Sequence, residues 1–347
     1  MSTKTHHSQK KALITGANGF VGSHLTKFLA DQGIDTYAYI LKGTNCDLLK
    51  ILHPTLTNVT IIEGNVLDQA SLEHYFQGME YIFHLAGVIT GYSQEDFDRI
   101  NLQGTRNVIK ACMQVIPDLE RLVIISSLAA AGPGTAEDPQ CEDKPATPIL
   151  DDYYGVSKFK VECVANACME DLPISIVRPC TVLGPGDRVS LDLFKSVKSY
   201  VKAYVGGARR KYSTVDVGDL TRGIYACATN PKAIGEIFFF SSNGTITWDE
   251  LHEVINAKVF HRKYGSLINI AFPKWMFKIL TVVMEAAYKI AKQPAPFLNQ
   301  SKMLAASAPG QCVSNEKAKR LLGWYPQETI ISTVVREGLW FQEQGWI

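Results

Sequence analysis

The sequence predicts an α/β protein with a doubly wound parallel sheet of the Rossmann type and a smaller C-terminal substrate domain. Short, wholly apolar runs recur through the first half of the 347 residues, as expected for strands buried on both faces of a parallel sheet. Stretches with helical spacing of apolar residues separate these runs. This alternation of strand and helix is typical of a doubly wound fold.

The expected elements follow one another in a regular order up to residue 180. The expected strands cover residues 11–16, 35–41, 59–64, 81–87, 121–127 and 174–179. The clearest helices cover residues 20–33, 100–115 and 154–170. Beyond residue 180 the alternation of strands and helices becomes irregular. The Rossmann domain is therefore assigned to residues 10–180 and the substrate domain to 181–347, with residues 212–245, including the run 236–242, returning to the sheet.

The composition excludes several classes of protein. A net charge of +1, with 20% charged residues, provides no strong field for nucleic acid, so no nucleic-acid partner is expected. The eight cysteines and eight histidines show no metal-ligand spacing, so no metal is predicted. The start of the chain lacks an apolar signal segment, and no run of about 18 apolar residues occurs, which favours a cytoplasmic location.

The stretch TGANGFVG connects the first expected strand to the first helix. Gly16, Gly19 and Gly22 would permit a tight turn, close approach of the backbone to a diphosphate, and close packing of helix on strand. The free N–H groups at the helix N-terminus would attract the anion. This turn predicts a dinucleotide site. Its expected contact residues are Gly16, Asn18, Gly19, Phe20, Val21 and Gly22.

Residues after the second and third strands indicate which dinucleotide binds. Residues 40–45 include no acid that would accept a hydrogen bond from a ribose 2′-OH. Lys42 stands where a cation would meet a 2′-phosphate, which favours NADP over NAD as the cofactor. After the third strand, the Asn65 amide oxygen would accept from the adenine amino group, and Val66 would pack on the ring.

A second constellation predicts acid–base chemistry. Tyr154 and Lys158 are four residues apart on an expected helix and therefore share a face. A nearby ammonium, aided by a positive nicotinamide ring, would lower the pKa of the phenol toward a value useful for proton exchange with an alcohol or ketone. Lys158 would also hold the nicotinamide ribose. Ser127, at the end of the fifth strand, would hydrogen-bond the substrate oxygen. Tyr154, Lys158 and Ser127 are the predicted catalytic residues.

Taken together, these motifs are similar to those of extended short-chain dehydrogenases/reductases, in the NAD-dependent epimerase/dehydratase and 3β-hydroxysteroid dehydrogenase group. The resemblance covers nearly the whole chain. Its motifs are TGANGFVG at 15–22, FHLAG at 83–87, NLQGTRN at 101–107, ISS at 125–127, YYGVSK at 153–158 and RPCTVLGPGD at 178–187.

The resemblance implies roles for individual residues. It favours Ser127 over Ser126, because the family's serine is the second of the pair, and Tyr154 over Tyr153, because only Tyr154 has a lysine four residues later. It implies structural roles for Asn101 and Asn107. It adds to the expected cofactor site Leu85, Ala86, Gly87 and Pro179.

The substrate is expected to be an apolar or small secondary alcohol or ketone. Relatives that act on nucleotide sugars usually carry an arginine shortly before a closing Leu-Gly-Trp stretch. Here residues 308–311 hold no arginine, although the closing stretch 322–326 is present. Residues 266–297 are rich in Phe, Trp, Ile and Met and are interpreted as an amphipathic helix that caps an apolar pocket. A helix on a membrane surface is the alternative interpretation.

Three functions stay open at this point. The leading hypothesis is an NAD(P)-dependent oxidoreductase that exchanges a hydride with its small-molecule substrate and uses Tyr154 as the acid/base. A nucleotide-sugar epimerase or dehydratase is the runner-up. A non-catalytic NAD(P)-binding regulator is the third, and the complete set of serine, tyrosine and lysine disfavours it. The resemblance also implies a homodimer that pairs through helices such as 100–115 and 154–170.

Overall fold

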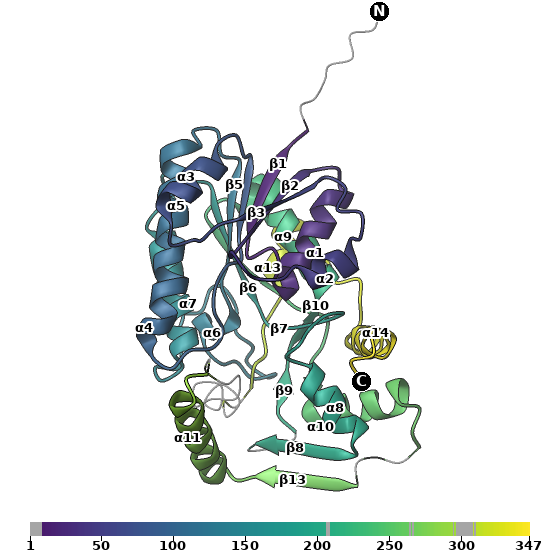
Figure 1. Ribbon diagram of the computed structural model, residues 1–347. Helices are drawn as coiled ribbons and strands as arrows, with labels where there is room; N and C mark the ends of the chain where they lie inside the picture. Colours follow the sequence, from purple (N-terminus) through teal and green to yellow (C-terminus); the bar gives the residue numbers. More distant parts are fainter. Residues whose placement is uncertain are drawn as a thin grey trace, which may run out of the picture.

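A seven-stranded parallel sheet forms the centre of the computed structural model (Figure 1), with strand order β11-β6-β5-β4-β1-β2-β3. The structure describes residues 9–205, 209–263, 265, 267–293, 295, 308 and 310–347. The strand order reverses between β1 and β4, which pair in parallel. In doubly wound sheets, ligands bind beyond the carboxyl ends of the strands at such a switch point.

Strands and helices up to residue 180 follow the expected alternation. The strands of the sheet are β1 (Lys11–Thr15), β2 (Asp35–Ile40), β3 (Val59–Glu63), β4 (Tyr81–His84), β5 (Arg121–Ile125), β6 (Ile174–Pro179) and β11 (Glu236–Phe240). The helices of this half are α1 (Phe20–Asp31), α2 (Asp47–Leu52), α3 (Gln69–Phe76), α4 (Gln94–Phe97), a π-helical turn (Asp98–Leu102), α5 (Gln103–Val115), α6 (Leu128–Ala131) and α7 (Tyr153–Asn166).

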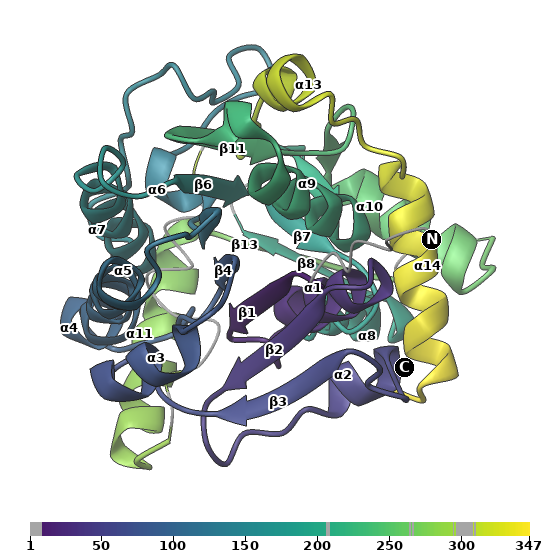
Figure 2. The same ribbon diagram turned by 90° about the horizontal axis from the view of Figure 1, so that it is seen from above.

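Helices lie on both faces of the sheet (Figure 2), and a separate apolar core fills the space under each set. On one face, α1 and α9 (Val217–Thr229) bury residues such as Leu25 and Ile224 against the strands. On the other face, α3, α5 and α7 bury residues such as Phe76, Val108 and Val161. The predicted fold class is therefore confirmed.

The boundary of α7 differs from the prediction. The helix ends at Asn166 rather than near residue 170. Backbone hydrogen bonds from Cys168 N to Ala165 O and from Leu172 N to Cys168 O turn the chain instead. Pro173 follows, and a residue that precedes proline is disfavoured in the α conformation.

The chain beyond residue 180 forms small sheets around a third core and returns only partly to the large sheet. Its strands are β7 (Thr181–Leu183), β8 (Val201–Val205), β9 (Lys211–Tyr212), β10 (Thr214–Asp216), β12 (Ile246–Thr247) and β13 (Ile268–Phe272). Its other helices are α8 (Leu191–Lys198), α10 (Trp248–Val254), α11 (Lys274–Ile290), α13 (Glu316–Leu322) and α14 (Ile330–Glu343). Of residues 212–245, β11 pairs with β6 and α9 covers the sheet, whereas β10 pairs with β7.

The closing Leu-Gly-Trp stretch ties the end of the chain to the large sheet. Gly323 ends α13 in the left-handed conformation, with φ of +64°. The buried Trp324 indole donates to the Asp219 carbonyl oxygen at 3.1 Å and packs edge-on against Phe240. The Asp219 carboxylate accepts from the backbone N–H groups of residues 327 and 328 at 3.0 Å each. The motif is therefore a structural anchor.

Residues 266–297 do not form the single helix that the sequence predicts. β13 pairs with β8 in parallel, and Pro273 then precedes α11. Proline fixes its own φ and lacks an N–H group, so it suits the start of a helix and not its interior. Residues 266, 294, 296 and 297 of this prediction lie outside the described residues.

Candidate active site

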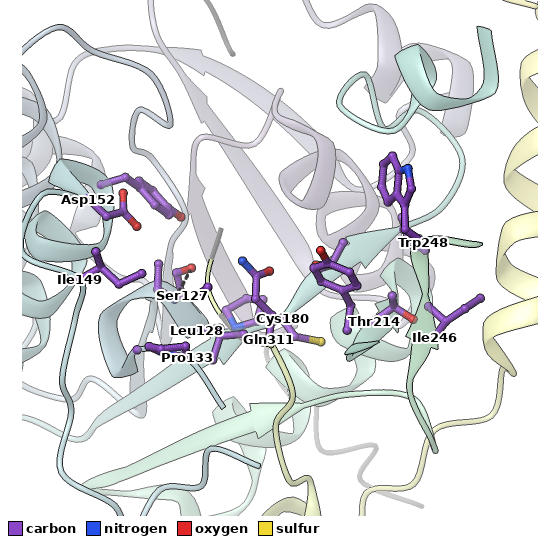
Figure 3. A pocket seen from close by; sticks show the side chains of 18 of the residues that line it. Ser127, Leu128, Pro133, Ile149, Asp152, Cys180, Thr214, Ile246, Trp248 and Gln311 are labelled. Atoms are coloured by element: carbon purple, nitrogen blue, oxygen red, sulfur yellow. Dashed lines mark hydrogen bonds between the residues drawn. The ribbon is translucent and has the colours of Figure 1, made fainter. Parts of the chain in front are cut away.

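A cavity of about 490 Å³ opens beyond the carboxyl ends of β5 and β6, against β9, β10, β12 and α10. Figure 3 shows Ser127 and Asp152 on one side of this pocket and Trp248 and Ile246 on the other. The pocket therefore lies between the first half of the chain and the small sheets of the second. Pro179, the last residue of β6, contributes to its wall.

Ser127 and Tyr154 both line the pocket. Ser127 follows β5 and caps α6, where its hydroxyl accepts from the Ala129 N–H at 3.1 Å. Tyr154 lies in the first turn of α7, and its phenol is hydrogen-bonded to the Ser127 side chain. The phenol ring packs edge-on against Phe97. Two hydroxyl groups are thus held together at the wall of the pocket.

The competing serine and tyrosine face elsewhere. The Ser126 hydroxyl is buried and donates to the Glu162 carboxylate at 2.5 Å. The Tyr153 side chain is exposed, and its carbonyl oxygen accepts from the Gln94 amide. This arrangement favours Ser127 and Tyr154 over their neighbours as groups that can reach a substrate.

The pKa of Tyr154 moves in the direction opposite to the sequence-based expectation. Burial raises it to about 12, the hydrogen bond to Ser127 opposes this shift, and the negative charge of Asp152 adds to it. The prediction that Lys158 lowers the pKa of this phenol is therefore wrong for the structure as it stands. Desolvation of the phenolate outweighs any stabilisation by the ammonium.

Lys158 lies one turn farther along α7, beside the loop that follows β4. Its ammonium donates to the Ile125 carbonyl oxygen at 2.8 Å. A Cβ built at Gly87 would lie 3.6 Å from the Lys158 Nζ, an ordinary contact distance, but only 2.9 Å from Asn101 Oδ1, so a side chain here would displace Asn101. Burial lowers the pKa of Lys158 to about 8, and the Glu162 carboxylate opposes that shift.

Asn101 and Asn107 make structural hydrogen bonds, as the resemblance implies. The Asn101 side chain accepts from the Val88 N–H at 2.8 Å and donates to the Val88 carbonyl oxygen and to the Ser157 hydroxyl. It thereby ties the loop after β4 to α7. The Asn107 amide donates to the Val66 carbonyl oxygen at 2.9 Å.

A buried ion pair behind the two serines was not foreseen from the sequence. Arg178 on β6 makes two hydrogen bonds to Glu162 on α7, from Nε to Oε1 at 2.9 Å and from Nη2 to Oε2 at 2.6 Å. The Ser126 hydroxyl donates to the same carboxylate. One signal in the sequence could have predicted this pair. Glu162 lies four residues after Lys158, on the helix face that packs against the protein, and a buried carboxylate requires a partner.

The glycine turn has the geometry of an anion cradle. Gly16 has φ of +72°, and a Cβ there would lie 2.8 Å from the Ala86 backbone nitrogen. A Cβ at Gly22 would lie 2.2 Å from the Gly16 carbonyl oxygen. Gly19 is exposed and begins α1 with no side-chain cap, so the first N–H groups of the helix stay accessible. The turn therefore fits a diphosphate.

The neighbouring loops complete the cofactor side. The Asn18 amide donates to the Thr44 hydroxyl at 2.9 Å and to the Asn45 carbonyl oxygen at 3.0 Å, and so holds the glycine turn against the loop after β2. Lys42 is exposed on that loop. Phe20 and Val21 lie in the first turn of α1, and the Phe20 ring packs edge-on against the His24 ring.

The other predicted cofactor residues serve partly as backbone scaffold. The Leu85 and Ala86 N–H groups donate to the Thr15 carbonyl and hydroxyl oxygens. The Asn65 side chain is exposed and accepts from the Leu67 N–H at 2.9 Å, which leaves its second lone pair for a ligand. Val66 is buried, and a Cβ at Gly104 would touch it, so the contact of Val66 with an adenine ring stays a prediction.

The apolar wall of the pocket comes from elements other than the predicted one. Leu128, Leu183, Trp248 and Leu251 line it, whereas no described residue of α11 does. The prediction that residues 266–297 cap the pocket is therefore wrong for α11. An apolar helix face can pack on many surfaces, and its sequence does not say which.

Asp152 is the charged residue that sequence reasoning missed. It precedes α7, is buried, and is the only charged side chain among the described residues that line the pocket. Its carboxylate oxygen would lie 2.9 Å from a Cβ at Gly155. The signal in the sequence was an aspartate immediately before the expected start of the helix.

Two features that would change the type of site are absent from the described residues. No group of three or more His, Cys, Asp or Glu side chains there is arranged to hold a metal ion. Within the same residues, every helix is too short or too polar to cross a bilayer.

Known proteins resemble this chain in sequence and in fold. The sequence profile described as the NAD dependent epimerase/dehydratase family matches residues 12–239. The chain is 25% identical to the decarboxylating sterol-4-alpha-carboxylate 3-dehydrogenase of Schizosaccharomyces pombe, over 81% of this chain and 84% of that protein. It is 27% identical to the ceramide reductase of Caulobacter vibrioides, over 69% of this chain and 67% of that protein.

A solved structure has the same fold. The dTDP-glucose 4,6-dehydratase of Bacillus anthracis, in complex with NAD, superposes with a TM-score of 0.77 at 16% identity, covering 97% of this chain and 98% of the other.

Proposed function

Because this chain belongs to the NAD-dependent epimerase/dehydratase family and is an NAD(P)-dependent oxidoreductase of that family, we propose that it exchanges a hydride between NAD(P) and a secondary alcohol or ketone of an apolar small molecule. One observation carries the proposal. Ser127 and Tyr154 present hydrogen-bonded hydroxyl groups to a pocket whose other described lining residues are mostly apolar.

The lining of the pocket also argues against a nucleotide-sugar substrate. A buried diphosphate requires cationic partners, and bidentate arginine is the usual one. The described lining residues include neither arginine nor lysine, and their one charged side chain, Asp152, would repel a phosphate. The relatives named above as a sterol dehydrogenase and a ceramide reductase are consistent with a lipid-like alcohol or ketone.

Each residue of the site has a defined task in this proposal. A nicotinamide held at this site would supply or accept the hydride. Tyr154 donates its phenolic proton to the carbonyl oxygen during reduction and takes the hydroxyl proton during oxidation. Ser127 hydrogen-bonds the same oxygen and positions it. Lys158 would hold the ribose next to the nicotinamide. The glycine turn would hold the diphosphate.

NADP is the proposed cofactor in preference to NAD. The loop after β2 offers Lys42 as a cation for a 2′-phosphate, and residues 40–45 lack the carboxylate that would bind a ribose 2′-OH. Asn18 holds this loop next to the glycine turn, so Lys42 lies on the side of the site where the adenosine ribose would bind.

A turnover screen tests the proposal. The purified protein is incubated with NADP(H) or NAD(H) and with sterol-like, flavonoid-like and nucleotide-sugar compounds. We expect a net change of nicotinamide absorbance with at least one apolar alcohol or ketone. Conversion of a nucleotide sugar without net absorbance change would instead assign an epimerase or dehydratase. Cofactor binding with neither reaction would assign a regulator.

A further inference from the structure

The surface formed by α11 and β13 exposes many large apolar side chains. On α11, Trp275 is 66% exposed, Ile279 56% and Val283 60%. On and before β13, Ile268 is 53% and Leu267 78% exposed. Figure 1 shows both elements at the bottom of the molecule, outside the central sheet. We refer to the exposed residues from 267 to 290 as the α11–β13 surface.

Most of the exposed apolar residues of α11 share one face. At about 100° per residue, Trp275, Ile279, Val282, Val283 and Ile290 project within one half of the helix circumference. Each of these side chains is exposed.

The other side of α11 contacts the protein. Thr281 on that side is fully buried, and Met284 is partly buried. Just after the helix, the Tyr92 hydroxyl donates to the Gln293 carbonyl oxygen at 2.9 Å, which ties the end of α11 to the loop before α4. The apolar face therefore points away from the protein and does not cover its core.

Cations border this face. Lys278 and Lys289 lie along one edge of it, and Lys292 follows the end of the helix; all three are exposed. Glu285 is the one acidic residue between positions 267 and 293. An apolar face edged by lysines and carrying a tryptophan is typical of a helix that lies in the interface of a bilayer with anionic lipids.

From this arrangement we propose that the α11–β13 surface docks the protein on a lipid bilayer that contains anionic lipids. α11 lies parallel to the membrane, with its apolar face among the acyl chains and its lysines at the phosphates. Its 17 residues are too few and too polar to span the bilayer.

A second copy of the chain fits this surface less well. In a two-fold dimer the same patch meets itself, so the lysines along its edge would approach their counterparts. That repulsion has no acidic partner on the surface apart from Glu285. Negative lipid headgroups satisfy the same lysines.

Vesicle flotation with the full-length chain tests the proposal. The vesicles contain phosphatidylcholine alone or phosphatidylcholine mixed with phosphatidylglycerol. We expect the wild type to float with the mixed vesicles and to bind pure phosphatidylcholine at least several-fold less. The double variant Ile279→Asp/Val283→Asp should lose binding to both. Lys278→Gln/Lys289→Gln should weaken only the part of the binding that depends on anionic lipid, by about fivefold for each lysine.

A matched control distinguishes docking through the α11–β13 surface from nonspecific adsorption to the vesicles. Ile234→Asp changes another exposed isoleucine, in the loop before β11, and should float like the wild type. Circular dichroism and thermal unfolding identify any variant that fails to fold. A position-specific measurement adds to this: lipids with brominated chains should quench wild-type fluorescence more than that of Trp275→Phe.

Two results would overturn the proposal. One is a wild type that floats no better than Ile279→Asp/Val283→Asp. The other is a stable dimer in sedimentation equilibrium that this double variant dissociates, together with no flotation of the wild type, because the surface would then be covered by a second copy.

Discussion

Glu162 and Arg178 form a bidentate ion pair directly behind the serines that follow β5, with 3% and 4% of their side chains exposed. The pair connects α7, which carries Tyr154 and Lys158, to β6 at the edge of the pocket. Breaking a buried pair leaves one uncompensated charge inside the protein. Glu162 therefore holds the helix of the site in place without facing the pocket.

Glu162→Gln should lower the free energy of unfolding by about 3–5 kcal/mol, because the Arg178 guanidinium would lose its charged partner. Urea unfolding at neutral pH measures the change. The matched control is Glu316→Gln, which removes a 75% exposed carboxylate from its pair with Lys319 and should change stability by less than about 1 kcal/mol. Equal effects of the two substitutions would contradict the structural role.

Tyr154→Phe should lower turnover by about a hundredfold or more, because the substrate oxygen loses its proton donor. Affinity for the cofactor, measured by fluorescence titration, should change little. Tyr153→Phe is the control, since that side chain is exposed and points away from the pocket. If Tyr153→Phe were the more damaging of the two, the acid/base role would belong to the other tyrosine.

The pH dependence of catalysis should follow the raised pKa of Tyr154, about 12. The phenol stays protonated at neutral pH, so ketone reduction has its proton donor. Alcohol oxidation needs the phenolate, so its rate should rise about tenfold per pH unit below that pKa. Because the negative charge of Asp152 contributes to the shift, Asp152→Asn should move the oxidation profile to lower pH. An unmoved profile would exclude this coupling.

Lys158 should make stability depend on pH in a defined window. Burial lowers its pKa from 10.5 to about 8 in the folded protein. Between these two pKa values the unfolded chain binds more protons than the folded protein, so the free energy of unfolding rises with pH. Below about pH 8 the lysine is charged in both states, and burial of that charge then destabilises the folded protein by its full amount. The stability of Lys158→Met relative to the wild type should therefore fall by about 3 kcal/mol between pH 7 and 10.5.

Urea unfolding of both proteins at the two pH values measures this change. Lys110→Met, at an exposed position of α5, is the control and should show no comparable pH-dependent difference. A Lys158→Met difference that stays constant with pH would mean that the lysine is solvated in the folded protein.

Cofactor preference should depend on Lys42. Lys42→Ala should raise the KM for NADP severalfold and leave the KM for NAD nearly unchanged, because an exposed cation contributes about 1 kcal/mol or less to binding a phosphate. Steady-state kinetics with both cofactors measure the ratio. Lys50→Ala, which removes another exposed lysine, on α2, is the control. If the ratio of the two KM values does not change, Lys42 does not select the cofactor.

Most of the Rossmann half could be predicted because its signals are local. Wholly apolar runs predict buried parallel strands, and each of the six expected up to residue 180 forms part of the sheet. The glycine turn could be located because each glycine meets a specific backbone atom at short range. The strands of the second half are short, and some pair with strands far along the chain, as β13 does with β8. The sequence near each of these strands therefore predicts little about where it pairs.

By itself the sequence determined the fold class and the glycine turn, because the periodicity of strands and helices and the spacing of the glycines are local. It also predicted a serine, a tyrosine and a lysine for the site, the serine through the resemblance to the family and the tyrosine through its spacing to the lysine. The tertiary structure alone decided what surrounds those side chains. Burial, and not the neighbouring lysine, governs the pKa of Tyr154. The pocket wall is formed by β12 and α10, while the apolar face of α11 points outward. Periodicity shows that a face is apolar, but its partner depends on contacts between residues far apart in the chain.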